Sequence, residues 1–241
     1  MTRKSLALAV ATVFLLAGGA AGAVLLLVRH EPAFYVQSAV PPGDERVQGS
    51  AECVGELAKL VEGVQNGQPW TVRLTEQQLN SYFEEDLLKE FSGEGWLFEH
   101  VRSPRVTFEA DRIRLGFRYG AGRWTTVVSL ELRAWLVETE PNLVAVEFQS
   151  LHAGAVPLSP QSLLERVAEA VHQYNIDPTW YRYNGHPVLL LRFQANRSNP
   201  TFQLQRLEIG PGTLLVTGRS LESAVPVSQA TLPTESEESR Q

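Results

Sequence analysis

The feature that most constrains this chain is an uncharged run near its N-terminus. Residues 5–28, SLALAVATVFLLAGGAAGAVLLLV, contain no charged side chain over 24 positions. A helix that rises about 1.5 Å per residue would carry this run over ~36 Å, enough to cross ~30 Å of hydrocarbon. We therefore expect residues 5–28 to form a transmembrane helix that contacts the lipid bilayer, and the remaining chain to fold on one side of it.

The charges that flank the run predict its orientation. Arg3 and Lys4 precede it, whereas Glu31 closely follows Arg29. Positive residues concentrate on the cytoplasmic side of membrane helices. This bias places residues 1–4 in the cytoplasm and the rest of the chain outside it, as a single-pass membrane protein.

A cleaved signal peptide is the alternative interpretation of the same run. Ala21-Gly22-Ala23 has the small-x-small form of a signal-peptidase site, so cleavage after Ala23 remains open. Cleavage there would leave the apolar residues 24–28 at the new N-terminus, and for this reason we favour an uncleaved anchor. Both interpretations place the folded part outside the cytoplasm.

Two small residues in the run raise the question of self-association. Gly18 and Gly22 are four positions apart, a spacing that lets two membrane helices approach closely. A second copy of the chain is therefore a candidate partner through Gly18 and Gly22. Incidental packing is the alternative, because small residues are common in membrane helices.

The charge balance outside the run excludes some partners. All 27 acidic residues lie at or beyond Glu31, together with 18 of the 21 basic ones, so this part has a formal net charge of −9. Nucleic acids and anionic headgroups need a basic surface, so we expect neither as a main partner. Cys53 is the only cysteine, which excludes an intramolecular disulfide and a cysteine-based zinc site.

A tether and a first amphipathic helix are expected to follow the anchor. Residues 29–44 read as a tether because Pro41-Pro42-Gly43 breaks regular structure. The domain then spans residues 45–219. Its first helix carries apolar residues at the 3.6-residue period of a buried face: Val47, Ala51, Val54, Leu57, Ala58, Val61 and Val64.

The clearest local motif begins at Thr75, after a short strand over 70–74. Thr75 can cap a helix and Gln78 stands three residues later, which together form a capping box. The helix that follows has a buried stripe of Leu79, Phe83, Leu87 and Phe91.

From Val106 the apolar period changes from 3.6 to 2. Apolar residues alternate with polar ones over 113–119, over 124–136 and again over 144–148. Such alternation predicts an antiparallel sheet that is covered on one face. The middle strand is long enough that it must twist, which favours a curved sheet wrapped around helices.

The last third of the chain predicts one more helix and four strands. Ser159-Pro160 starts the helix and Asp177-Pro178 ends it. Asn184-Gly185 predicts a hairpin turn, further strands cover 200–208 and 212–219, and the acidic tail 220–241 is expected to be disordered. The predicted fold class is therefore α+β: an N-terminal transmembrane helix followed by a curved antiparallel sheet packed on two or three amphipathic helices.

The search for catalytic chemistry is negative. The sequence has no Gly-x-Ser-x-Gly elbow, phosphate-binding glycine loop, dinucleotide fingerprint or His-Glu-x-x-His motif. The five histidines are scattered, and the carboxylate groups Glu84/Glu85/Asp86 and Glu165/Glu169 fall on polar helix faces, where solvated charge is expected. We therefore predict no catalytic residue, no metal ligand and no cofactor.

The segment LTEQQLNSYFEEDLL, residues 74–88, resembles the start of the domain in a YpmS-like family of membrane-anchored bacterial domains of unknown function. A more distant similarity is to tubular lipid-binding (TULIP-like) domains. The resemblance runs over residues 70–219 in the order of elements, and Ala153–Pro160 would match the small-residue and proline stretch before the second helix. It implies a lipid or other apolar ligand held between helix and sheet, by analogy of fold.

The resulting hypothesis is a membrane-anchored domain of the cell envelope that binds a lipid or similar apolar ligand. Candidate ligand-binding residues are those that would face each other between helix and sheet: Leu79, Phe83, Leu87, Ile113, Phe117, Leu130 and Trp180. Core packing is the alternative role for Trp180. A non-enzymatic scaffold or interaction domain is the second hypothesis, and a hydrolase that uses acidic residues is the third.

Overall fold

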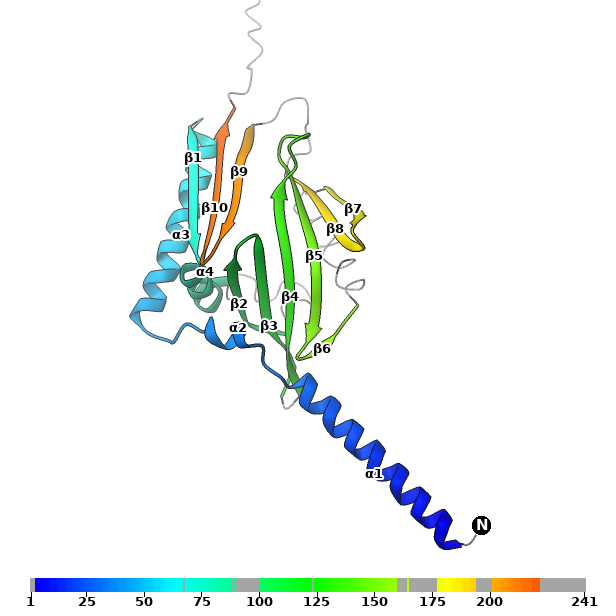
Figure 1. Ribbon diagram of the computed structural model, residues 1–241. Coiled ribbons are helices and arrows are strands. Elements are labelled where there is room, and N and C mark those ends of the chain that lie inside the picture. The colour runs from blue at the N-terminus through cyan, green and yellow to red at the C-terminus, as the bar shows by residue number, and fades with distance from the viewer. Residues whose placement is uncertain are drawn as a thin grey trace, which may run out of the picture.

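Helices occupy the first part of the chain and strands most of the rest (Figure 1). The computed structural model describes residues 3–66, 68–87, 89, 100–122, 124–159, 164, 177–193 and 201–221, without the side chains of residues 3–14, 17, 124, 177 and 178. The helices are α1 (Arg3–Val28), α2 (Ala33–Gln37), α3 (Asp44–Gln65) and α4 (Glu76–Tyr82), and a short π-helix, η1 (Phe83–Leu87), continues α4.

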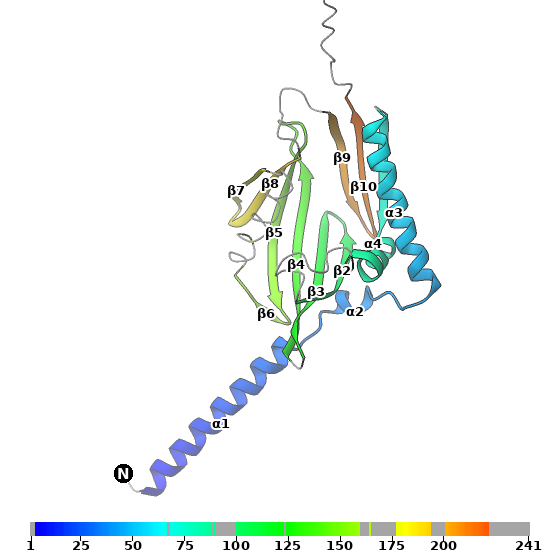
Figure 2. The same ribbon diagram turned by 180° about the vertical axis from the view of Figure 1, so that it is seen from behind.

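The strands form two antiparallel sheets. The three-stranded sheet has the order β1 (Pro69–Thr75), β10 (Thr213–Ser220), β9 (Phe202–Gly210). The seven-stranded sheet has the order β2 (Val101–Glu109), β3 (Arg112–Ala121), β4 (Trp124–Leu136), β5 (Leu143–Ala153), β8 (His186–Arg192), β7 (Asp177–Tyr183), with β6 (Val156–Pro157) paired to β5. Figure 2 shows α3 running along the three-stranded sheet, with the seven-stranded sheet beyond β9.

The predicted α+β class with a large antiparallel sheet is confirmed. Leu130, Leu132 and Phe148 are buried on one face of β4 and β5, as the period-2 pattern requires. The ladder between β4 and β5 shifts register between Glu131 and Leu132, and such a bulge bends and twists a strand.

The hairpin predicted at Asn184-Gly185 is also confirmed. These two residues connect β7 to β8 and have φ values of 49° and 85°. A two-residue turn of this kind needs positive φ at both central positions, which asparagine and glycine adopt most easily.

The capping box at the start of α4 forms as the sequence predicts. The backbone N–H of Gln78 donates to Thr75 Oγ1 at 3.2 Å, and the N–H of Thr75 donates to Gln78 Oε1 at 3.0 Å. Asn80, which is 2% exposed, bonds both backbone groups of Val106, with Nδ2 to O at 2.9 Å and N to Oδ1 at 2.7 Å. The motif therefore fixes α4 against β2.

The face that α3 buries differs from the expected stripe. Val47, Val54 and Val61 are 58%, 45% and 53% exposed, whereas Gly49 and Ser50 are buried. A Cβ on Gly49 would lie 2.7 Å from Ser81 Oγ, so the small residues of α3 let α4 approach closely. The spacing of apolar residues does not reveal a helix–helix contact that is made by glycine and serine.

Part of the expected tether packs against the seven-stranded sheet. Tyr35 of α2 is fully buried, and its hydroxyl donates to Ser103 O at 2.9 Å. Arg105 stacks 4.3 Å from the centre of the Tyr35 ring and donates from Nη1 to Tyr35 O at 2.6 Å. A Cβ on Gly116 would lie 2.7 Å from Tyr35 Cδ2, so a glycine in β3 leaves the room that this ring needs.

The end of α1 also contacts the sheet. Leu27 O accepts from the backbone N–H of Ala155 at 2.8 Å, and Val28 O accepts from Thr126 Oγ1 at 2.6 Å. Within the part of the chain whose side chains the structure describes, which leaves out residues 3–14 and 17 of α1, no helix is both long and apolar enough to cross a membrane. Of the helix expected between Ser159 and Asp177 the structure describes Leu164, which is buried, and the stripe position Phe91 and the tail from Glu222 onward lie outside the described residues.

Candidate functional site: an apolar groove between α3 and the two sheets

An apolar groove of about 470 Å³ opens between the C-terminal half of α3 and the inner faces of both sheets. This volume lies within the range of small-molecule sites, roughly 300–1,000 Å³. Its lining residues come from six elements and the residue that follows β8: Leu60, Val61, Val64, Gln65, Trp70, Leu136, Val144, Phe193, Phe202, Leu204, Leu207 and Val216. Figure 2 shows the region between α3, β9 and β4 where these elements converge.

Each wall of the groove follows from local structure. Leu60, Val61 and Val64 lie within two turns of one another on α3, so they present one side of the helix. Leu136 and Val144 are directly paired across β4 and β5. They continue the apolar face of the seven-stranded sheet to its end.

Trp70 forms the part of the groove where α3 meets the three-stranded sheet. It is 6% exposed and pairs with Gly218 across β1 and β10. A Cβ on Gly218 would lie 2.7 Å from Trp70 Cη2, and one on Gly63 would lie 2.6 Å from Trp70 Cβ. Two glycines therefore leave room for the indole between helix and sheet, and its Nε1 has no hydrogen-bond partner among the described residues.

The lining residues that the structure describes carry no charge. Twelve described residues line the groove, and among them Gln65 and Trp70 have polar side-chain atoms. Such a wall offers no cation to a phosphate or carboxylate and no acid or base to a reaction. The arrangement is suited to holding hydrocarbon and to excluding water from it.

A second hollow of about 420 Å³ has a different character. It lies between the segment Gln37–Glu45 and the start of α4, where Glu76, Gln77 and Asn80 line it. Asn80 is already bonded to Val106. Among the residues that the structure describes, no group of three or more histidine, cysteine, aspartate or glutamate side chains could hold a metal ion.

The carboxylates of η1 hold elements together. Glu85 Oε1 accepts from Arg46 Nε at 2.7 Å, and this hydrogen bond lowers the pKa of Glu85. Asp86 accepts a short hydrogen bond from Ser50 Oγ. Both contacts join η1 to α3, which gives these acidic side chains a structural role. Glu165 and Glu169 lie outside the described residues.

Six of the seven residues proposed from sequence lie in packed core clusters. Phe117, Leu130 and Trp180 pack in one cluster, where the Trp180 ring is 5.8 Å from Phe148. Leu79 and Phe83 pack with Val106 and Phe108 in a second cluster. Ile113 touches both clusters, and Leu87 is half-buried at the end of η1. None of the seven is among the described residues that line the groove.

Sequence reasoning therefore missed the groove itself. Val61 and Val64 were expected on a buried helix face, and the apolar residues of the last two strands were assigned only to strands. The sequence contains one signal for it: Phe202, Leu204 and Val216 are apolar positions on the last two predicted strands, and no predicted helix covers them. The fold brings α3 beside these residues, because Leu60 and Val64 pack in one apolar cluster with Phe202, Leu204 and Val216.

The buried thiol of Cys53 gives a prediction on reactivity. Cys53 is fully buried next to Trp70 and Val72, and burial raises the pKa of its thiol to about 11. Because the thiolate is the reactive form, we expect no modification by a thiol reagent at pH 8 in the folded protein and complete modification in denaturant. Rapid labelling of the folded protein, measured by intact mass, would contradict this packing.

Comparison with protein-family models, with curated proteins and with solved structures finds no match to this chain.

Proposed function

We propose that this protein is a membrane-anchored domain, held outside the cytoplasm, that binds an acyl chain of a lipid in the groove between α3 and the two sheets. The observation that carries the proposal is that the described residues lining a groove of about 470 Å³ are uncharged. Each methylene buried there contributes about 0.8 kcal/mol before the entropic cost of binding. Several buried methylenes are needed for useful affinity, which favours a linear chain.

The anchor in this proposal is α1. It begins at Arg3 and ends at Val28, and it includes the 24 uncharged residues 5–28. The proposed orientation follows the charges on either side, with Arg3 and Lys4 inside. A Cβ on Gly18 or Gly22 would meet nothing within 4 Å, so this side of α1 is free for a second copy of the helix.

A tryptophan in place of Val61 tests the groove. Val61 lines the groove and is 53% exposed, so the larger side chain can occupy the groove without disturbing the core. Displacing two methylenes of the ligand, at about 0.8 kcal/mol each, lowers affinity roughly tenfold. The measurement is titration of the full-length protein in detergent with a fluorescent fatty acid.

Val54→Trp is the matched control. Val54 lies two turns earlier on α3, is 45% exposed and is not among the residues that line the groove. We expect this variant to bind like the wild type. Equal affinities of Val61→Trp and the wild type would place the ligand elsewhere, and no binding by the wild type would refute the proposal.

The exposed apolar residues of α3 support a second candidate, an interaction domain. Val47, Ala51, Val54 and Ala58 follow a spacing of four, three and four residues, and all four are exposed. This spacing is typical of a helix that packs against another helix. Val54→Glu would weaken association with a protein partner and leave fatty-acid binding unchanged, whereas the groove variant would do the opposite.

A further inference from the structure

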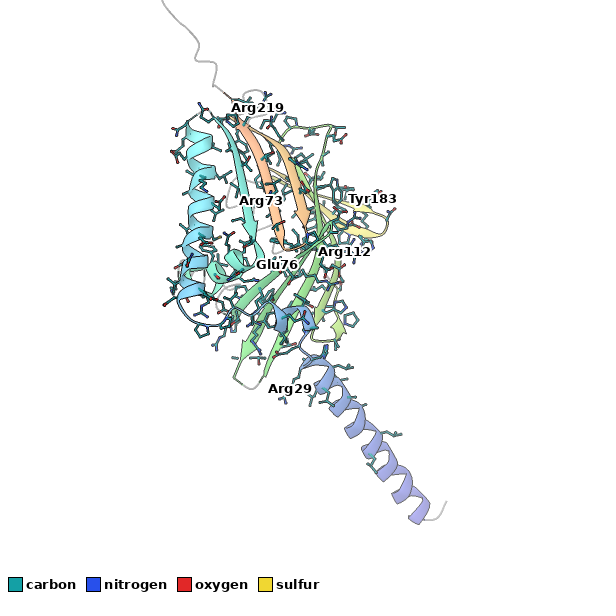
Figure 3. The ribbon with its side chains drawn as sticks, turned by 60° about the vertical axis from the view of Figure 1, so that its left-hand side comes forward. Arg29, Arg73, Glu76, Arg112, Tyr183 and Arg219 are labelled. Carbon is teal, nitrogen blue, oxygen red and sulfur yellow. The ribbon has the colours of Figure 1, made fainter. Side chains whose placement is uncertain are left out.

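The groove and the anchor lie at opposite ends of the domain. Strand β5 connects the two ends: Val144 lines the groove, and Ala153 immediately precedes Gly154 and Ala155, which meet the end of α1. Nine residues of strand at ~3.3 Å each separate Val144 from Ala153 by about 30 Å. Figure 3 shows the two ends, with Arg29 beside α1 and Arg219, which follows Gly218 in β10, at the far end of the domain.

The connection between anchor and domain fixes this separation. Glu31 pairs with Arg118 at 2.7 Å, next to the contacts of Leu27 and Val28 with the sheet. Four residues later, Tyr35 is buried between Arg105 and Gly116. These contacts lie on three different strands, so the chain between α1 and α2 cannot swing the domain toward the membrane without breaking them.

We infer that the groove exchanges its acyl chain with a soluble carrier on the side away from the anchoring membrane, and not with that membrane directly. This inference rests on the proposed function. The groove end of β5 lies about 30 Å along the strand from the end of α1, so a lipid of the anchoring bilayer would have to leave that bilayer to reach the groove. Each methylene drawn into water lowers the population of such a lipid roughly fourfold.

A soluble carrier fits the charge of the sequence that follows β10 better than a second bilayer does. Strand β10 ends there at Ser220, and residues 222–241 carry four glutamates and one arginine. An anionic lipid surface attracts basic segments and repels acidic ones. A carrier that presents one acyl chain meets no such repulsion.

The test uses the full-length protein in vesicles of phosphatidylethanolamine and phosphatidylglycerol, with the domain facing outward. A photoactivatable fatty acid is supplied bound to serum albumin, or as a phospholipid acyl chain either in the anchoring vesicles or in separate vesicles of the same composition. Cross-linked peptides of α3 and β9 are then quantified. We expect labelling from albumin to exceed that from either vesicle arm by more than about tenfold, given the cost of each exposed methylene.

Equal or stronger labelling from the anchoring vesicles would overturn the inference, and so would stronger labelling from the separate vesicles. Tyr35→Ala, which removes the buried ring, is expected to gain labelling from the anchoring vesicles, whereas Tyr35→Phe is not. Absence of labelling in all arms would instead refute the acyl-chain function itself. The two failures are therefore distinguishable.

Discussion

Replacing Trp70 with alanine is expected to lower the free energy of unfolding by about 4 kcal/mol, the cost of truncating a buried aromatic residue. Trp70 is 6% exposed and packs against Cys53, Val72 and Leu74 in the cluster that joins α3 to the three-stranded sheet. The neighbouring Gly63 and Gly218 have no side chains that could fill the cavity. Denaturant unfolding of the full-length protein in detergent, followed by circular dichroism, measures the change.

Trp70→Phe is the control for this prediction. It keeps an aromatic ring between the two glycines and removes an indole N–H that has no partner among the described residues. We expect it to cost less than half as much as Trp70→Ala. A loss below about 1 kcal/mol for the alanine variant would mean that the indole is not packed as described.

Replacing Tyr35 with alanine is expected to release α2 and the end of α1 from the seven-stranded sheet. The change removes a fully buried ring, its hydrogen bond to Ser103 O and its stacking with Arg105. Truncation of a buried aromatic residue costs about 3 kcal/mol or more. Because a short segment alone depends on this ring, we expect local undocking rather than unfolding of the sheets.

Distances between spin labels on α1 and β4 measure this release. The wild type should give one narrow distribution and Tyr35→Ala a broad one, while Tyr35→Phe should lose only the hydroxyl bond, worth about 1 kcal/mol. A narrow distance distribution for Tyr35→Ala would contradict this role of the ring.

The docking through Tyr35 also depends on pH. Burial raises the pKa of Tyr35 above its ordinary value of 10. The stabilisation that the neutral ring provides is therefore complete below pH 10 and is lost as the pH rises through this higher pKa.

Local patterns in the sequence predicted the individual elements well. The alternation after Val106, the capping box at Thr75 and the turn at Asn184-Gly185 are each decided by neighbours within a few residues. The structure therefore has the predicted antiparallel strands, helix start and hairpin at these positions. Such local signals fix where an element begins and which of its faces is apolar.

Contacts between distant segments could not be predicted in the same way. β1 pairs with β10 across more than 130 residues of chain, and no local pattern specifies this partner. The contact between Gly49 of α3 and Ser81 of α4 depends on the absence of a side chain, so hydrophobic periodicity missed this part of the buried face of α3, although Leu57 and Val64 of the expected stripe do pack against a core cluster. The groove depends on the first of these arrangements, which brings β10 next to α3, and none of the seven residues proposed from sequence is among its described lining residues.

The tether shows the same limit. Residues 29–44 contain prolines and glycine and read as a linker, yet Tyr35 within them is fully buried. Its pocket exists because Gly116 interrupts the arginine-rich face of β3 and Arg105 of β2 stacks on the ring. None of these residues is close to Tyr35 in sequence, so the docking follows only from the fold.

Native mass spectrometry of the full-length protein tests the central claim most directly. The protein would be purified from cells in mild detergent and released from its micelle in the spectrometer. We expect an added mass of one lipid on the wild type and on Val54→Trp, and a strong reduction of this species for Val61→Trp. Wild-type protein that carries no lipid, and gains none when fatty acid is added, would contradict the account of an acyl-chain groove.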